Sequence, residues 1–177
     1  MSVIAASPKK ESGSVIAIIV EHTLLLCAIV PYALVALVLR LVLARAFFLA
    51  GQDKIDGPVV SLVLKHADLS FMLPAQIKDA AMRVFETHFA GMAVPPAVIT
   101  SLFTYAEFIL PIVLVLGFAT RYAAAILFAI TVLTQIYIDP AAFWTLHVYW
   151  LSLLLVLLTC GPGDVSIDRL IRYLHEK

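Results

Sequence analysis

The sequence predicts an all-α integral membrane protein, built as a four-helix bundle with an amphipathic helix in one long loop and a short interfacial helix at the C-terminus. Of its 177 residues, 63% are hydrophobic and 14% are charged, and its mean hydropathy of +1.03 is far above that of a soluble domain. Four segments approach the roughly 20 apolar residues that cross the hydrocarbon core of a bilayer. Short turns between the last three segments predict that they are antiparallel neighbours.

Charge and cysteine content exclude several function classes. Twelve Lys and Arg residues balance twelve Asp and Glu residues, so no basic surplus is available to bind the phosphates of a nucleic acid. Cys27 and Cys160 are far apart and form no CxxC pair, zinc knuckle or disulfide framework. The histidines show no HxH or HxxxH spacing, so we expect no metal site. Without a nucleotide-binding or nucleophile motif, no catalytic residue is identified, and we do not expect the chain to be an enzyme on its own.

The first span is predicted over about residues 23–51, after a retained lead-in over residues 1–22. Lys9 and Lys10 precede six apolar residues, a stretch too short for the apolar region of a signal peptide. The span itself is overlong, and three residues interrupt it: Pro31, Arg40 and Arg45.

Three further spans are predicted over about residues 98–118, 121–138 and 140–160. Their ends carry the residues that usually stop or cap helices. Gly117 and Thr120 close the second span and cap the third, and Asp139 precedes Pro140 as an N-cap for the fourth. Gly161, Pro162 and Gly163 then end the transmembrane domain, which we place at residues 23–163.

Two amphipathic helices are predicted outside the spans. The extramembrane loop over residues 52–96 is too long to lack structure, and its apolar residues between Ile77 and His88 fall on one helical face. We expect that helix to lie on the bundle or on the membrane surface. In the tail over residues 164–177, Ile167, Leu170 and Leu174 repeat at helical spacing, which predicts a short interfacial helix.

The distribution of basic residues predicts that both termini of this multi-pass protein are cytoplasmic and that the long loop is outside. Positive residues favour the cytoplasmic side of a membrane. Six of them fall on the side of the termini and four on the side of the loop; the six are Lys9, Lys10, Arg121, Arg169, Arg172 and Lys177.

Arg40 and Glu107 are predicted to form a buried polar pair. A charged group near the bilayer centre costs about 2.5–3.5 kcal/mol on insertion scales, so each needs a partner. Arg40 lies eleven residues before Gly51 and Glu107 ten residues after Ala97, which places both roughly 15–17 Å below one surface. The pair is interpreted either as a structural clamp between helices or as part of a substrate, proton or quinone site.

The helix faces around this pair support close packing. Arg40, Ala44, Phe47, Gly51 and Lys54 step by four, three, four and three residues and therefore form one stripe with small members. Arg45 lies roughly 140° around the helix from Arg40, so it belongs to another face. It either snorkels outward or points into a second polar pocket.

Further polar residues are predicted to line an outward vestibule. For His147 two interpretations stay open: a satisfied buried histidine, or a proton-transfer or metal role. The candidate vestibule consists of Arg45, Thr104, Gln135, Asp139 and His147.

The run from Arg40 to Lys54 resembles the first helix of the DoxX/DoxD-like membrane proteins, in which Arg, a small residue, Phe, Gly and Lys follow in order, with Ala44 replacing the usual Gly. The resemblance covers roughly residues 38–170. Its other matching segments are Pro95 through Glu107, Gly117 with Thr120 and Arg121, the Gly161–Gly163 ending, and Ser166 to Asp168.

This resemblance implies a four-helix bundle in the cytoplasmic (inner) membrane of a bacterium, without a covalently bound cofactor. It implies an accessory subunit of a membrane-associated redox or stress-response system, with a quinone as the candidate ligand. Partners are then the lipid bilayer and a candidate membrane or periplasmic protein. The alternatives are a small transporter or exporter component and a ligand-free structural scaffold.

Overall fold

The computed structural model describes residues 17, 19–20, 30–64 and 67–176. The chain divides into two units, residues 1–31 and residues 32–177, and the account below concerns the second unit. The predicted lead-in and the predicted start of the first span at about residue 23 lie largely outside the described residues.

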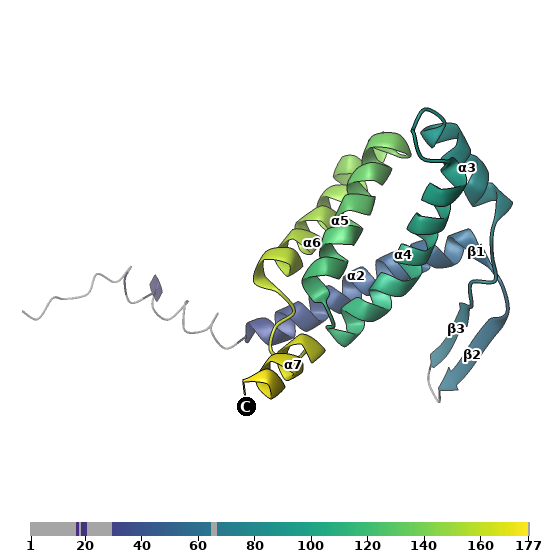
Figure 1. Ribbon diagram of the computed structural model, residues 1–177. Coiled ribbons are helices and arrows are strands. Elements are labelled where there is room, and N and C mark those ends of the chain that lie inside the picture. The colour runs from purple at the N-terminus through teal and green to yellow at the C-terminus, as the bar shows by residue number, and fades with distance from the viewer. Residues whose placement is uncertain (1–16, 18, 21–29, 65–66, 177) are drawn as a thin grey trace, which may run out of the picture. The chain divides into compact units, whose positions relative to one another are not determined.

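Four helical segments in the described part of the chain are long and apolar enough to cross a membrane, which confirms the predicted all-α membrane fold. They are α2 (Tyr32–Lys54), α4 (Pro96–Leu116), α5 (Thr120–Tyr137) and the segment Pro140–Cys160. The last segment begins with a short 3-10 turn, η1 (Pro140–Ala142), and a π-helical turn, η2 (Phe143–His147), before α6 (Val148–Cys160). Figure 1 shows α4, α5 and α6 running side by side.

The helices pack through small and apolar residues. The core between the spans includes Ala36 and Ala44 on α2 and Ala123 and Ala124 on α5, each nearly or completely buried. Small side chains allow helix backbones to approach closely in a membrane. Large apolar residues cover the outer faces, as expected for a surface in contact with lipid; examples are Leu102, Ile109 and Tyr122.

The loop between α2 and α4 contains strands that the sequence analysis did not predict. β1 (Ile55–Asp56) pairs antiparallel with β4 (Gln76–Ile77), and β2 (Val59–Leu64) pairs antiparallel with β3 (Ala67–Met72). The predicted amphipathic helix is confirmed as α3 (Asp79–Phe89). Phe85 and Phe89 of α3 are buried against α4 and α5, so α3 lies on the bundle.

Most of the predicted helix ends are confirmed. Gly117 ends α4 in the left-handed conformation, with φ at 68°. The side chain of Asp139 accepts a hydrogen bond from the backbone N–H of Ala142 at 3.3 Å and caps η1. Thr120 as a side-chain cap is wrong, because its hydroxyl is buried without a hydrogen-bond partner in the described chain.

The C-terminal helix α7 (Ile167–His175) was predicted as a helix, and it supplies the cap that Thr120 does not. The carboxylate of Asp168 accepts hydrogen bonds from the backbone N–H groups of Ala119 at 2.7 Å and Thr120 at 3.0 Å. In return, the N–H of Asp168 donates to the carbonyl of Gly117 at 3.0 Å. These bonds fasten α7 to the turn between α4 and α5. We call this end of the bundle the α7 end and the opposite end the α3 end (Figure 1).

Candidate functional site

A buried ion pair joins α2 to α4 near the α3 end of the bundle. The ammonium group of Lys54 contacts the carboxylate of Glu107, whose side chain is 6% exposed. Lys54 also donates a hydrogen bond to the carbonyl of Ala50 at 3.2 Å. The pair therefore cancels the charge that Glu107 would otherwise bring into the apolar interior.

Gly51 and Pro111 explain why the pair forms at this position. Pro111 has no N–H, so the carbonyl of Glu107, four residues earlier, lacks the usual i→i−4 hydrogen bond of the helix. Gly51 lies against that carbonyl, since a Cβ added to it would come within 3.1 Å of both the C and the O of Glu107. This close approach brings Lys54, one turn further along α2, within reach of the Glu107 carboxylate.

The ion pair forms part of the wall of a cavity of about 330 Å³. Ligand pockets in proteins are typically about 300–1,000 Å³, mostly apolar and furnished with a few polar groups, and this cavity is similar. Four helices contribute to it. The lining residues are Asp53 and Lys54 of α2, Ala80, Ala81, Val84 and Phe85 of α3, Glu107 of α4, Thr134 of α5 and Ile138 after it.

The predicted pairing of Arg40 with Glu107 is wrong. Arg40 is completely buried, and its guanidinium donates to the carbonyls of Val165 at 2.5 Å and Ala36 at 3.3 Å. It lies at the α7 end, where a Cβ added to Gly117 would collide with its Nη1.

The prediction was wrong because residue counting assumed that Gly51 and Ala97 lie at the same membrane surface. In the structure Gly51 packs against Glu107 itself, ten residues further along α4. At 1.5 Å per residue this shifts the register of the two helices by about 15 Å. The first turns of α4 therefore extend beyond the end of α2, and α3 packs on them.

Three residues of the predicted vestibule come together at the α3 end. The side chain of Gln135 donates to the carbonyl of Pro140 at 2.8 Å, and its oxygen lies 2.6 Å from Nδ1 of His147. Because the Gln135 oxygen can only accept, Nδ1 of His147 carries the proton. His147 is 4% exposed and Asp139 caps the adjoining turn, so these contacts favour a satisfied buried histidine.

The other two vestibule residues lie elsewhere. Thr104 is fully buried one turn before Glu107, and its hydroxyl has no hydrogen-bond partner in the described part of the chain. Arg45 is exposed on α2. Lys54 was missed as the partner of Glu107, although its place on the stripe with Arg40 and Gly51 was a signal that could have found it.

The comparisons identify the family of this chain. A family model described as DoxX matches residues 35–147, which is more than half of the sequence. The chain belongs to the DoxX family. No curated protein and no solved structure shows a significant match to it.

DoxX is a membrane family, and together with the four apolar helices this makes the chain a multi-pass membrane protein. The DoxX match runs from α2 to the end of η2, so it includes both partners of the ion pair and every residue that lines the cavity. All of α6 and all of α7 lie beyond it.

Proposed function

We propose that this DoxX protein is an accessory subunit of a membrane-associated redox or stress-response system and that it binds a quinone head group in the cavity beside Lys54 and Glu107. The observation that carries the proposal is a mostly apolar cavity with a buried ion pair in its wall. Ionisable residues within a membrane-spanning region are candidates for function by default.

The residues of the cavity fit a quinone head group, which is a flat apolar ring with two carbonyl oxygens. The ammonium group of Lys54 has three N–H donors. Ala50 and Glu107 accept two of them, so a third is available for a ligand carbonyl. Ala80 and Ala81 of α3 have small side chains, which leave room for a ring beside the pair.

A bound quinone would supply electron and proton transfer, and the protein would supply its place and orientation. The ammonium of Lys54 holds one carbonyl oxygen of the ring, and Glu107 keeps that ammonium in position. The apolar side chains of Val84 and Phe85 exclude water from the ring faces. This division of labour suits an accessory subunit, whose partner protein carries out the redox reaction.

The proposal also includes an orientation. With both termini in the cytoplasm, the α3 end and its strands are on the outer side of a bacterial inner membrane, where a periplasmic partner has access. Single-cysteine variants in a background without Cys27 and Cys160 test this. An impermeant maleimide added to intact cells is expected to label Ser70→Cys, in β3, and not Glu176→Cys. The reverse pattern would invert the orientation.

Direct binding tests the ligand. The purified protein in nanodiscs is titrated with a short-chain ubiquinone and with a naphthoquinone, by calorimetry. We expect saturable binding of at least one, roughly tenfold weaker binding by Lys54→Met, and no change in Lys78→Met. Lys78 is a matched control because it pairs with Asp56 and does not line the cavity.

A second variant covers the case in which Lys54→Met fails to fold. Ala81→Leu fills the cavity without altering the ion pair, and it is expected to abolish binding in a folded protein. Absence of saturable binding by the wild type would contradict the quinone role and favour the scaffold alternative. Quinone-independent solute flux in proteoliposomes would favour the transporter alternative.

A further inference from the structure

Arg45 is an exposed arginine near the middle of a membrane-spanning helix. It lies nine residues before Lys54 at one end of α2 and thirteen residues after Tyr32 at the other. At 1.5 Å per residue, it is about 14 Å and about 20 Å from the two ends. Its guanidinium makes no hydrogen bond or ion pair with any residue in the described part of the chain.

The surroundings of Arg45 are apolar. Val38, Leu41, Val42 and Leu49 share its face of α2, at the spacing of a single exposed stripe, and each of them is about half exposed. A lipid-facing arginine at this depth costs about 2.5–3.5 kcal/mol on insertion scales. A stripe of this kind, with one charge at its centre, is therefore incomplete without a counter-charge.

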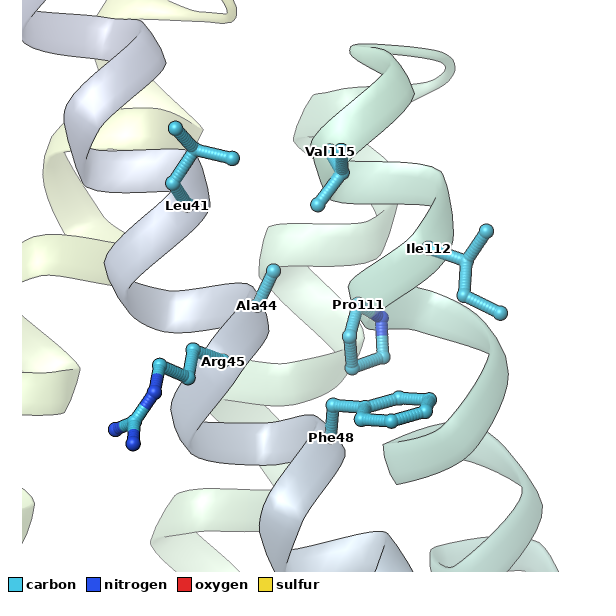
Figure 2. A pocket seen from close by; sticks show the side chains of 7 residues that line it. All are labelled: Leu41, Ala44, Arg45, Phe48, Pro111, Ile112 and Val115. Carbon is cyan, nitrogen blue, oxygen red and sulfur yellow. The ribbon is translucent and has the colours of Figure 1, made fainter. Parts of the chain in front are cut away.

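An apolar groove of about 430 Å³ adjoins the stripe. On α2 the groove is lined by Leu41, Ala44, Arg45 and Phe48, and on α4 by Pro111, Ile112 and Val115. Figure 2 shows Phe48 extending toward Pro111, while the guanidinium of Arg45 points away from α4. A helix that packs on the stripe can thus fill the groove and meet the Arg45 guanidinium at its edge.

We propose that this face of α2 binds a transmembrane helix of a partner protein that carries an aspartate or glutamate near the middle of the bilayer. An arginine and a carboxylate form charge-assisted hydrogen bonds and cancel each other's charge, and packing into the groove adds contact area. The inference agrees with the accessory role proposed above, but it does not depend on a quinone, because the groove and the cavity are lined by different residues.

The described spanning helices of a second copy of this chain do not supply the required carboxylate. In the described spanning helices the acidic residues are Asp53, in the last turn of α2, and Glu107, which is paired with Lys54. Neither is a free carboxylate at the depth of Arg45. We therefore assign the counter-charge to a different protein.

A designed peptide tests the proposal. The probe is a helix of about 20 leucine and alanine residues with one central glutamate, and its controls carry glutamine or leucine at that position. Binding to the full-length protein is measured by energy transfer between dyes in phosphatidylcholine vesicles. The wild type is expected to bind the glutamate peptide roughly tenfold more tightly than the leucine peptide.

Variants of the protein separate charge from packing. Arg45→Leu is expected to lose the preference for glutamate, and Arg45→Glu to prefer a peptide with a central lysine. Val115→Phe narrows the groove and is expected to weaken binding of all peptides. Val156→Phe, the same change on the exposed face of α6, is the control and is expected to bind as the wild type does.

Four results would overturn the proposal. The first is equal binding of the glutamate and leucine peptides by the wild type, and the second is a glutamate preference that persists in Arg45→Leu. The third is loss of the preference when phosphatidylglycerol is added, since Arg45 would then bind the headgroup of an anionic lipid. The fourth is Arg45-dependent self-association, which would make a second copy the occupant. Quinone binding is measured separately, so failure of the helix-binding proposal does not decide the quinone proposal, and the reverse also holds.

Discussion

The carboxylate of Asp168 caps the third spanning helix at Thr120, 48 residues earlier in the sequence, through a hydrogen bond of 3.0 Å from the backbone N–H. A helix N-terminus has unpaired N–H groups and a positive partial charge, so a carboxylate satisfies both. The cap also holds Ala119, whose φ of 45° is unusual for a residue other than glycine.

Asp168→Ala is expected to lower the free energy of unfolding by about 1 kcal/mol, the usual effect of losing an N-cap. Thermal unfolding in detergent measures the change. Asp164→Ala is the control, because Asp164 is largely exposed and its pair with Arg169 contributes little. Equal effects of the two variants would mean that the cap does not stabilise the bundle.

Breaking the Lys54–Glu107 pair is expected to destabilise the protein. Glu107→Leu should reduce the free energy of unfolding by about 3 kcal/mol. This is the low end of the usual loss for a buried ion pair, because 23% of the Lys54 side chain is exposed. The double variant Glu107→Leu, Lys54→Met should recover much of that loss and still fail to bind quinone. A double variant less stable than Glu107→Leu alone would show that the pair is not the relevant interaction.

Replacement by leucine is expected to have opposite effects on protein stability at Arg40 and at Arg45. Arg40→Leu removes a fully buried side chain and leaves the carbonyl of Val165 without its donor, so the protein is expected to lose stability. Arg45→Leu removes an exposed charge from an apolar stripe and is expected to stabilise the isolated protein. Unfolding in mixed micelles compares the two, and a loss of stability in Arg45→Leu would contradict the assignment of its lipid-facing position.

Gly51→Ala is expected to destabilise the contact between α2 and α4. The added Cβ of Gly51→Ala would press on the Glu107 carbonyl, so the helices must separate by a few tenths of an ångström and the ion pair must loosen. Gly91→Ala is the matched control, because a Cβ there meets nothing within 4 Å. Quinone affinity and unfolding temperature should both fall for Gly51→Ala only, and a wild-type result at Gly51 would show that the close approach is not required.

The spans were predictable from the sequence because a bilayer imposes a minimum length of apolar helix, and proline and glycine mark the ends. Pro96 and Gly117 illustrate this, since they bound α4 in the structure. The helix α3 was predictable from its apolar face. The strands β2 and β3 were not predicted, because short apolar runs do not distinguish strand from helix by periodicity.

The candidate site was less predictable, since it depends on the axial register of α2 against α4. Glu107 was recognised as a buried charge in need of a partner, and both Arg40 and Lys54 lay on the facing stripe. Residue counting from the two surfaces favoured Arg40, but the packing of Gly51 on Glu107 places Lys54 there instead. The cap by Asp168 joins segments far apart in sequence, and local spacing carries no signal for it.

The docking of α7 also bears on the order of events during biosynthesis. A chain emerges from the ribosome N-terminus first, so α2, α4 and α5 leave the ribosome before residues 165–168 do. Until then, the guanidinium of Arg40 lacks the Val165 carbonyl and the first N–H groups of α5 lack the Asp168 carboxylate. Residues 165–168 thus close the bundle, and a nascent chain interrupted before them presents unpaired polar groups on Arg40 and at the start of α5.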